Sequence, residues 1–86
     1  MKKIVETTEG EGLEKFLGEK VLLMCINYFY HGKLLGINDT CVLLGEPSIV
    51  YETGPFSGAA YKDAQRLPAD EWYVATAMIE SFGAGR

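Results

Sequence analysis

The segment from Val21 to Ile26 is apolar at every position, and it limits how the chain can fold more than any other feature. A strand with one wet face alternates apolar and polar residues, whereas a continuous apolar run is typical of a strand buried on both faces. A chain of 86 residues rarely has enough mass to cover both faces of such a strand. We therefore expect a short helix, or a neighbouring subunit, to cover the second face.

The segment that follows, residues 30–37, predicts a second strand with sharp bends. Gly32 and Gly36 interrupt its strand-like pattern, and glycine within a strand often marks a bulge or a bend. A strand that curls around a small barrel needs such positions, so these glycines favour a barrel over a flat sheet. A turn at residues 38–40 then leads into a third, apolar strand at residues 41–44.

Two more strands and one helical turn complete the predicted fold. Leu13, Phe16 and Leu17 have the i, i+3, i+4 spacing of an apolar helical face, so a short helical turn should precede the first strand. Residues 72–75 and 78–82 predict the fourth and fifth strands. We expect an all-β fold, a small and strongly bent five-stranded barrel of the SH3-like or Sm type. We expect a flexible lead-in at residues 1–12, a single domain at residues 13–82 and a flexible tail at residues 83–86.

Charge and hydropathy restrict the classes of partner. The formal net charge is −4 and the basic residues are dispersed, which argues against a protein held to duplex nucleic acid by phosphate contacts. A small pocket for single-stranded bases stays open, because it needs aromatic faces and a few donors rather than net charge. No segment approaches the roughly 20 apolar residues of a membrane span, and no secretory signal is visible. We expect a cytoplasmic protein that does not contact membranes.

The pattern of residues does not indicate a catalytic site or a cofactor site. Cys25 and Cys41 lie within apolar runs and lack the further ligands of a zinc site, so we expect small buried thiols in a reducing compartment. His31 is the single histidine and has no placed nucleophile, so a strand-surface or barrel-rim position is expected for it. The sequence predicts no enzyme activity, no metal site and no cofactor.

Three segments within residues 13–44 resemble the Sm-like family (Sm, LSm and Hfq). Residues 13–21 are similar to the junction between the family's helix and first strand, where Leu-Gly precedes the strand. Residues 30–34 have the aromatic-x-Gly-x-Leu core of the Sm1 motif, and residues 36–44 resemble its end, with Asn38 or Asp39 in the place of the family's aspartate. The resemblance implies a homo-oligomeric ring, usually of five to seven subunits, in which the fourth strand of one subunit pairs with the fifth of the next.

The resemblance also implies binding of U-rich or A-rich single-stranded RNA by two turns near the pore. Transferred to this chain, the candidate RNA-binding residues are Asn38, Asp39, Thr40 and Cys41 in the first turn and Thr76, Ala77 and Met78 in the second. The second turn departs from the family, since Ala75, Thr76 and Ala77 stand where the Sm2 motif has Arg or Lys followed by Gly. The pocket therefore lacks the guanidinium that would stack on a base, and we expect a degraded site.

The segment 45–71 is the part of the chain that is most particular to this sequence. It falls where the Sm-like family has a variable loop between strands three and four. Loops on rigid scaffolds often carry function, and Phe56, Tyr61 and Arg66 are the candidate partner-contact residues here. An elongated hairpin that only thickens the ring is an equal alternative. The chain is thus expected to be either a ring that binds single-stranded RNA weakly or a ring that contacts a protein partner through this loop.

Overall fold

The computed structural model describes Val5 and residues 10–86, so most of the predicted lead-in, residues 1–4 and 6–9, lies outside the described residues. The elements, in chain order, are η1 (Leu13–Phe16), β1 (Lys20–Cys25), β2 (Phe29–Ile37), β3 (Cys41–Glu52), β4 (Asp63–Arg66), β5 (Glu71–Ala75), η2 (Thr76–Met78) and β6 (Ile79–Ala84). Both η segments are short 3-10 turns. The predicted helical turn is thus confirmed at η1.

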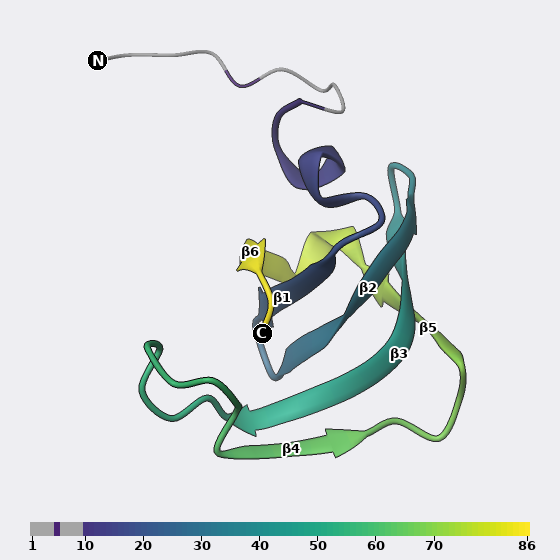
Figure 1. The fold of residues 1–86 in the computed structure, drawn as a ribbon. Helices are drawn as coiled ribbons and strands as arrows, with labels where there is room; N and C mark the ends of the chain where they lie inside the picture. The colour runs from purple at the N-terminus through teal and green to yellow at the C-terminus, as the bar shows by residue number, and fades with distance from the viewer. Residues whose placement is uncertain (1–4, 6–9) are drawn as a thin grey trace.

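The described strands form one antiparallel sheet of six strands that curls on itself (Figure 1). The strand order is β4-β3-β2-β1-β6, and β5 also pairs with β3. The long strand β3 pairs through its first part with β5 and through its last part with β4, so it has two partners besides β2. This arrangement confirms the predicted all-β, barrel-like class, with one strand more than expected.

The bend of β2 occurs at the two predicted glycines. The pairing of β2 with β3 shifts register across Gly32 and again immediately before Gly36. A Cβ atom on Gly32 would lie 2.8 Å from the carbonyl oxygen of Gly45, which is closer than real Cβ atoms approach backbone. The two strands can approach this closely only because residue 32 has no side chain.

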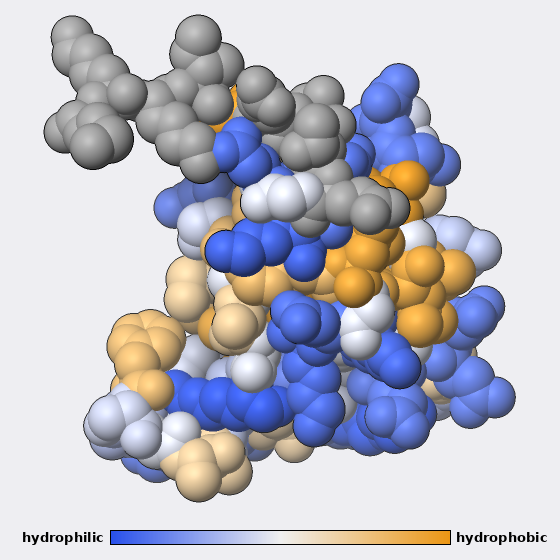
Figure 2. Space-filling model, turned by 45° about the horizontal axis from the view of Figure 1, so that its top comes forward, coloured by the Kyte–Doolittle hydropathy of each residue, from blue (hydrophilic) through white to orange (hydrophobic). Residues whose placement is uncertain are grey.

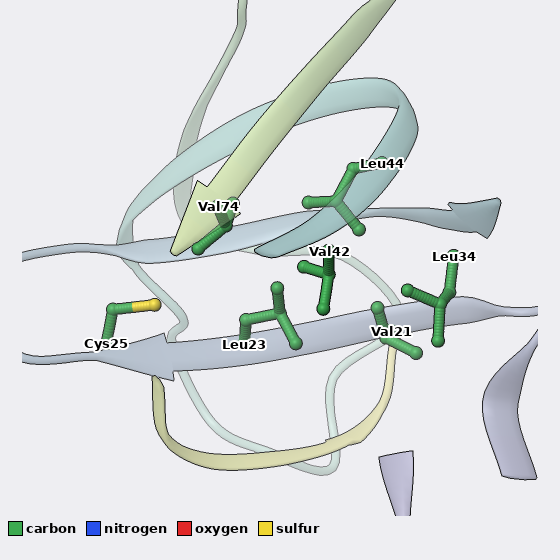
Figure 3. Packing of buried hydrophobic residues seen from close by; sticks show 7 residues of the cluster. All are labelled: Val21, Leu23, Cys25, Leu34, Val42, Leu44 and Val74. Carbon is green, nitrogen blue, oxygen red and sulfur yellow. The ribbon is translucent and has the colours of Figure 1, made fainter. Parts of the chain in front are cut away.

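One cluster of apolar side chains fills the interior of the curled sheet (Figure 3). Its members come from β1, β2, β3 and β5 and are buried: Val21, Leu23, Cys25, Leu34, Val42, Leu44 and Val74. Phe16 of η1 and Trp72 of β5 are partly buried and pack against this cluster. Phe16 also meets Phe82 of β6 edge to face, with ring centroids 6.4 Å apart. The short helical turn therefore closes one end of the core.

Strand β1 is buried on both faces, as its apolar run predicts, although Ile26 beyond its end is exposed. Leu22 points away from the core cluster and still keeps only 7% of its surface exposed. It pairs across the sheet with His31 and Gly83. The His31 ring in turn contacts Tyr61 of the loop after β3, with centroids 5.2 Å apart. At Leu22 the second face is therefore covered by distant parts of the same chain.

Residues 83–86, predicted to be a flexible tail, are hydrogen-bonded to other parts of the chain. Strand β6 runs on to Ala84, and Gly83 and Ala84 pair with β1. The backbone N–H of Gly85 donates to the carbonyl oxygen of Lys20 at 2.9 Å. The edge of β1 offers backbone hydrogen-bonding groups along its length, and these bind a segment that consists mostly of small residues.

The segment 45–71 forms an elongated hairpin rather than one long loop. Strand β3 continues to Glu52, and β4 returns alongside its last part. Between its two partners β3 kinks at Glu46, which has a φ of 49°, an uncommon value for a residue with a side chain. The N–H of Glu46 donates to the carbonyl oxygen of Asp70 at 3.0 Å, which ties the kink to the connection between β4 and β5.

Candidate functional site

The two turns predicted to form an RNA site lie in direct contact. The side-chain oxygen of Asn38 accepts hydrogen bonds from the backbone N–H of Thr40 at 2.8 Å and of Cys41 at 2.9 Å, which shapes the first turn. The backbone N–H of Thr76 donates to the carbonyl oxygen of Thr40 at 3.0 Å. The Thr76 hydroxyl donates to the carbonyl oxygen of Asp39, also at 3.0 Å. Residues 37 positions apart in the chain therefore form one surface.

The chemistry of this surface is weakly suited to a phosphate backbone. None of the candidate residues in the two turns carries a positive charge, and Asp39 adds a negative one. Ala77 and Met78 are exposed, and the carbonyl oxygen of Met78 accepts a hydrogen bond from Ile26 at 3.1 Å. The surface offers small apolar contacts and a few polar groups, but no cation for a phosphate or a base face.

Two strands next to this surface have an edge without a partner among the described residues. Strand β5 pairs with β3 alone, and β6 pairs with β1 alone. Each carries an exposed aromatic side chain: Tyr73 on β5 keeps 67% of its surface exposed, and Phe82 on β6 keeps 42%. An uncovered edge with apolar side chains is a ready template for pairing with another strand.

Large apolar side chains reach the surface elsewhere as well. Figure 2 shows one face of the molecule on which apolar residues gather among hydrophilic ones. The exposed set includes Ile26, Tyr28, Leu35, Tyr51, Phe56 and Met78. Tyr28 and Tyr51 meet edge to face with centroids 6.4 Å apart. The surface therefore offers apolar contact area in several places.

Two of the three candidate partner-contact residues, Phe56 and Tyr61, lie in the loop after β3, and the third, Arg66, lies on β4. Phe56 is 70% exposed at the tip of the loop after β3. Tyr61 is partly buried, because its ring packs against both His31 and the guanidinium of Arg86. Arg66 lies exposed on β4, whose backbone pairs with β3 at Ser48. The structure thus brings Phe56 and Tyr61 together at the Arg86 guanidinium and places Arg66 on a different element, β4.

Sequence reasoning missed the part that Arg86 plays in this loop. Its guanidinium donates to the carbonyl oxygens of Thr53 and Ala60 from one nitrogen, and of Pro55 from the other. Arg86 is separated from these residues by 26 or more positions, so no local pattern could have indicated the contact. A glycine-rich end normally predicts a loose segment, and only its docking on the sheet orders it.

Among the described residues, the pKa values of His31, Cys25 and Tyr30 depart from the ordinary value of each group. Burial lowers the pKa of His31; the nearby positive charge of Lys20 acts in the same direction, while a hydrogen bond to the carbonyl oxygen of Arg86 opposes both. Burial raises the pKa of the Cys25 thiol. Burial also raises the pKa of Tyr30, with smaller contributions from nearby groups. The largest cause of each shift is the removal of the group from water.

Within the described part of the chain, no group of three or more His, Cys, Asp or Glu side chains could hold a metal ion. Over the same residues, no helix is long and apolar enough to cross a membrane. The described residues define an all-β, barrel-like domain in which β5 and β6, on either side of a 3-10 turn, each have an edge without a partner. Comparisons with family models, with curated proteins and with solved structures found no match to the chain.

Proposed function

We propose that the protein is an Sm-like subunit that assembles into a homo-oligomeric ring and serves as a protein-interaction scaffold. In this ring the free edge of β5 in one subunit pairs with the free edge of β6 in the next. The observation that carries the proposal is the pair of uncovered edges, each with an exposed aromatic residue, Tyr73 or Phe82.

The geometry of the two edges supports a closed assembly. They belong to consecutive strands joined by η2, so each subunit presents two different edges, and the contact between copies joins unlike surfaces. A contact of this kind generates rings when the rotation between subunits closes. A small domain also gains stability from such a contact, because its own core is limited.

The outer edge of β4 is less suited to such pairing. Its four residues are all exposed and include Asp63 and Arg66. Charged side chains on a short edge strand are a common protection against pairing with another chain. The contrast between β4 and the edges of β5 and β6 therefore favours a contact that uses the latter two.

The mass of the assembly in solution tests this proposal. Sedimentation analysis of the wild type should give a single species at a multiple of the 9.5 kDa subunit mass. Tyr73→Lys and Phe82→Lys should each give monomers, because they place a charge in the paired edge. Ala64→Lys on the exposed strand β4 is the matched control and should stay assembled. A monomeric wild type at tens of micromolar would refute the proposal, as would assembled edge variants.

Weak binding of single-stranded RNA is a second candidate function. The observation that favours it is the contact of the two turns, through which Thr76 hydrogen-bonds to both Asp39 and Thr40. The absence of a cation from these residues and the net charge of −4 argue for low affinity.

Fluorescence anisotropy with labelled oligo-U and oligo-A at two salt concentrations tests this second candidate. We expect weak binding that declines with salt, and stronger binding by Thr76→Arg, which supplies the missing guanidinium. Ala64→Arg adds the same charge on β4 and should change the affinity less. If assembled protein binds neither oligonucleotide, the turns are no RNA site and the scaffold function stands alone.

A further inference from the structure

The last two residues of the sequence, Gly85 and Arg86, fill a site built by three separate segments. The backbone N–H of Gly85 donates to the carbonyl oxygen of Lys20 at 2.9 Å. The N–H of Arg86 donates to the hydroxyl oxygen of Tyr61 at 3.2 Å. The Nε2–H of His31 donates to the carbonyl oxygen of Arg86 at 3.1 Å. Both N–H groups of this dipeptide and one of its carbonyl groups are therefore bound by other parts of the chain.

The loop after β3 surrounds the guanidinium with oxygen atoms. One nitrogen of Arg86 lies 2.7 Å from the carbonyl oxygen of Thr53 and 2.9 Å from that of Ala60. The other nitrogen lies 2.9 Å from the carbonyl oxygen of Pro55. Three backbone acceptors at these positions match the planar, forked set of donors that a guanidinium presents.

Aromatic rings complete this cage. The guanidinium carbon of Arg86 lies 4.6 Å from the ring centroid of Tyr61 and 6.0 Å from that of Phe56. Aromatic faces attract cations and stack well on the planar guanidinium. A lysine ammonium has all of its donors on one nitrogen, whereas two different nitrogens of Arg86 bind these acceptors, so the cage favours arginine.

The position before the arginine accepts glycine alone. A Cβ atom on Gly85 would lie 2.6 Å from two atoms of the His31 ring and 3.1 Å from the backbone carbon of Val21. The ring cannot easily give way, because it packs against Tyr61 and holds the carbonyl oxygen of Arg86. The site therefore discriminates at two successive positions, with glycine first and arginine second.

We propose that this is a recognition site for a Gly-Arg dipeptide, which Gly85 and Arg86 occupy in the isolated chain, and that a Gly-Arg segment of a partner polypeptide exchanges for them. All of the contacts are hydrogen bonds or ring contacts. Arg86 is only partly buried, and two of its guanidinium bonds lie at exposed positions. The acidic chain, with a net charge of −4, attracts a basic partner. The site uses neither free strand edge, so the inference goes beyond the proposed ring and does not depend on it.

The chain's own dipeptide competes with any partner at a high effective concentration. The test therefore removes this competitor in the full chain with the double variant Gly85→Ala/Arg86→Ala. The peptide acetyl-Ala-Gly-Arg-amide is added, and amide NMR shifts of Gly54, Gly58 and Lys62 in the loop are followed. We expect saturable shifts toward the wild-type positions, with at least tenfold weaker binding of the matched peptides that carry Ala-Arg or Gly-Lys. Equal binding of the three peptides, or no binding, would overturn the proposal.

The single variant Arg86→Ala keeps the test informative if the double variant does not fold. It empties the cage and leaves Gly85 in place. Guanidinium ion or N-acetyl-arginine amide at millimolar concentration should then restore the loop shifts, and N-acetyl-lysine amide should not. Arg66→Ala removes an arginine from β4 and leaves the site filled, so it should show no response to either ligand. Equal rescue by the lysine ligand, or none by guanidinium, would refute the cage. Assembly is measured separately, so failure here says nothing of the ring.

Discussion

Replacement of Gly32 by alanine puts a methyl group where two bent strands leave no room for one. The new Cβ would lie 2.8 Å from the carbonyl oxygen of Gly45 and 3.1 Å from the Cβ of Leu44. Neither neighbour can move freely, because Leu44 is fully buried in the core and Gly45 is paired with both β2 and β5. Overpacking of this kind costs about 1–3 kcal/mol of unfolding free energy.

Gly36 on the same strand is a matched control. A Cβ there would meet only the Cβ of Leu43, at an ordinary contact distance of 3.8 Å, and its backbone is not left-handed. Gly36→Ala should therefore be neutral or should raise stability by about 0.4–1 kcal/mol, because alanine has less freedom in the unfolded chain. The two variants should differ by about 1–4 kcal/mol.

Urea unfolding followed by the fluorescence of Trp72, which packs against the core, measures this difference. Protein concentration must be the same in all samples, since assembly would make stability depend on it. In thermal unfolding, each kcal/mol corresponds to about 4–8 °C for a domain of this size. Equal stability of the two variants, or a larger loss in Gly36→Ala, would show that the close approach at Gly32 does not restrict the strand.

Two further predictions concern titration and thiol reactivity. The pKa of His31 is lowered on folding, so below its ordinary value of about 6.5 the unfolded chain binds more protons. The free energy of unfolding should then have its full value above that pH and fall as the pH drops toward the lowered pKa. His31→Gln should lack this part of the pH dependence. Identical pH profiles of the two proteins would contradict its assignment to His31. Burial raises the pKa of the Cys25 thiol, whereas Cys41 is partly exposed, so mass spectrometry should show that a thiol reagent modifies Cys41 first. Equal rates for the two thiols would contradict the burial of Cys25.

The sequence alone predicted those elements whose formation depends on neighbouring residues in the chain. The apolar run from Val21 to Ile26 predicts β1, and the glycines at 32 and 36 predict the bends of β2, because burial and missing side chains act at the residues themselves. The start of β3 and the position of β5 follow from similar apolar patterns. The pairing of the two candidate turns was expected only through the resemblance to the Sm-like family, and the contacts of Thr76 show that the turns do meet.

Only the tertiary structure decided the parts that depend on distant partners. The four residues of β4 are all exposed and show no apolar alternation, and they form a strand because the extended end of β3 offers an edge. Gly85 and Arg86 would be loose by composition, yet β1, His31 and the loop after β3 bind both of their backbone N–H groups, the carbonyl oxygen of Arg86 and its guanidinium. Hydrogen bonds between residues 25–55 positions apart form only once the sheet has brought the segments together, and no local pattern of residues records them.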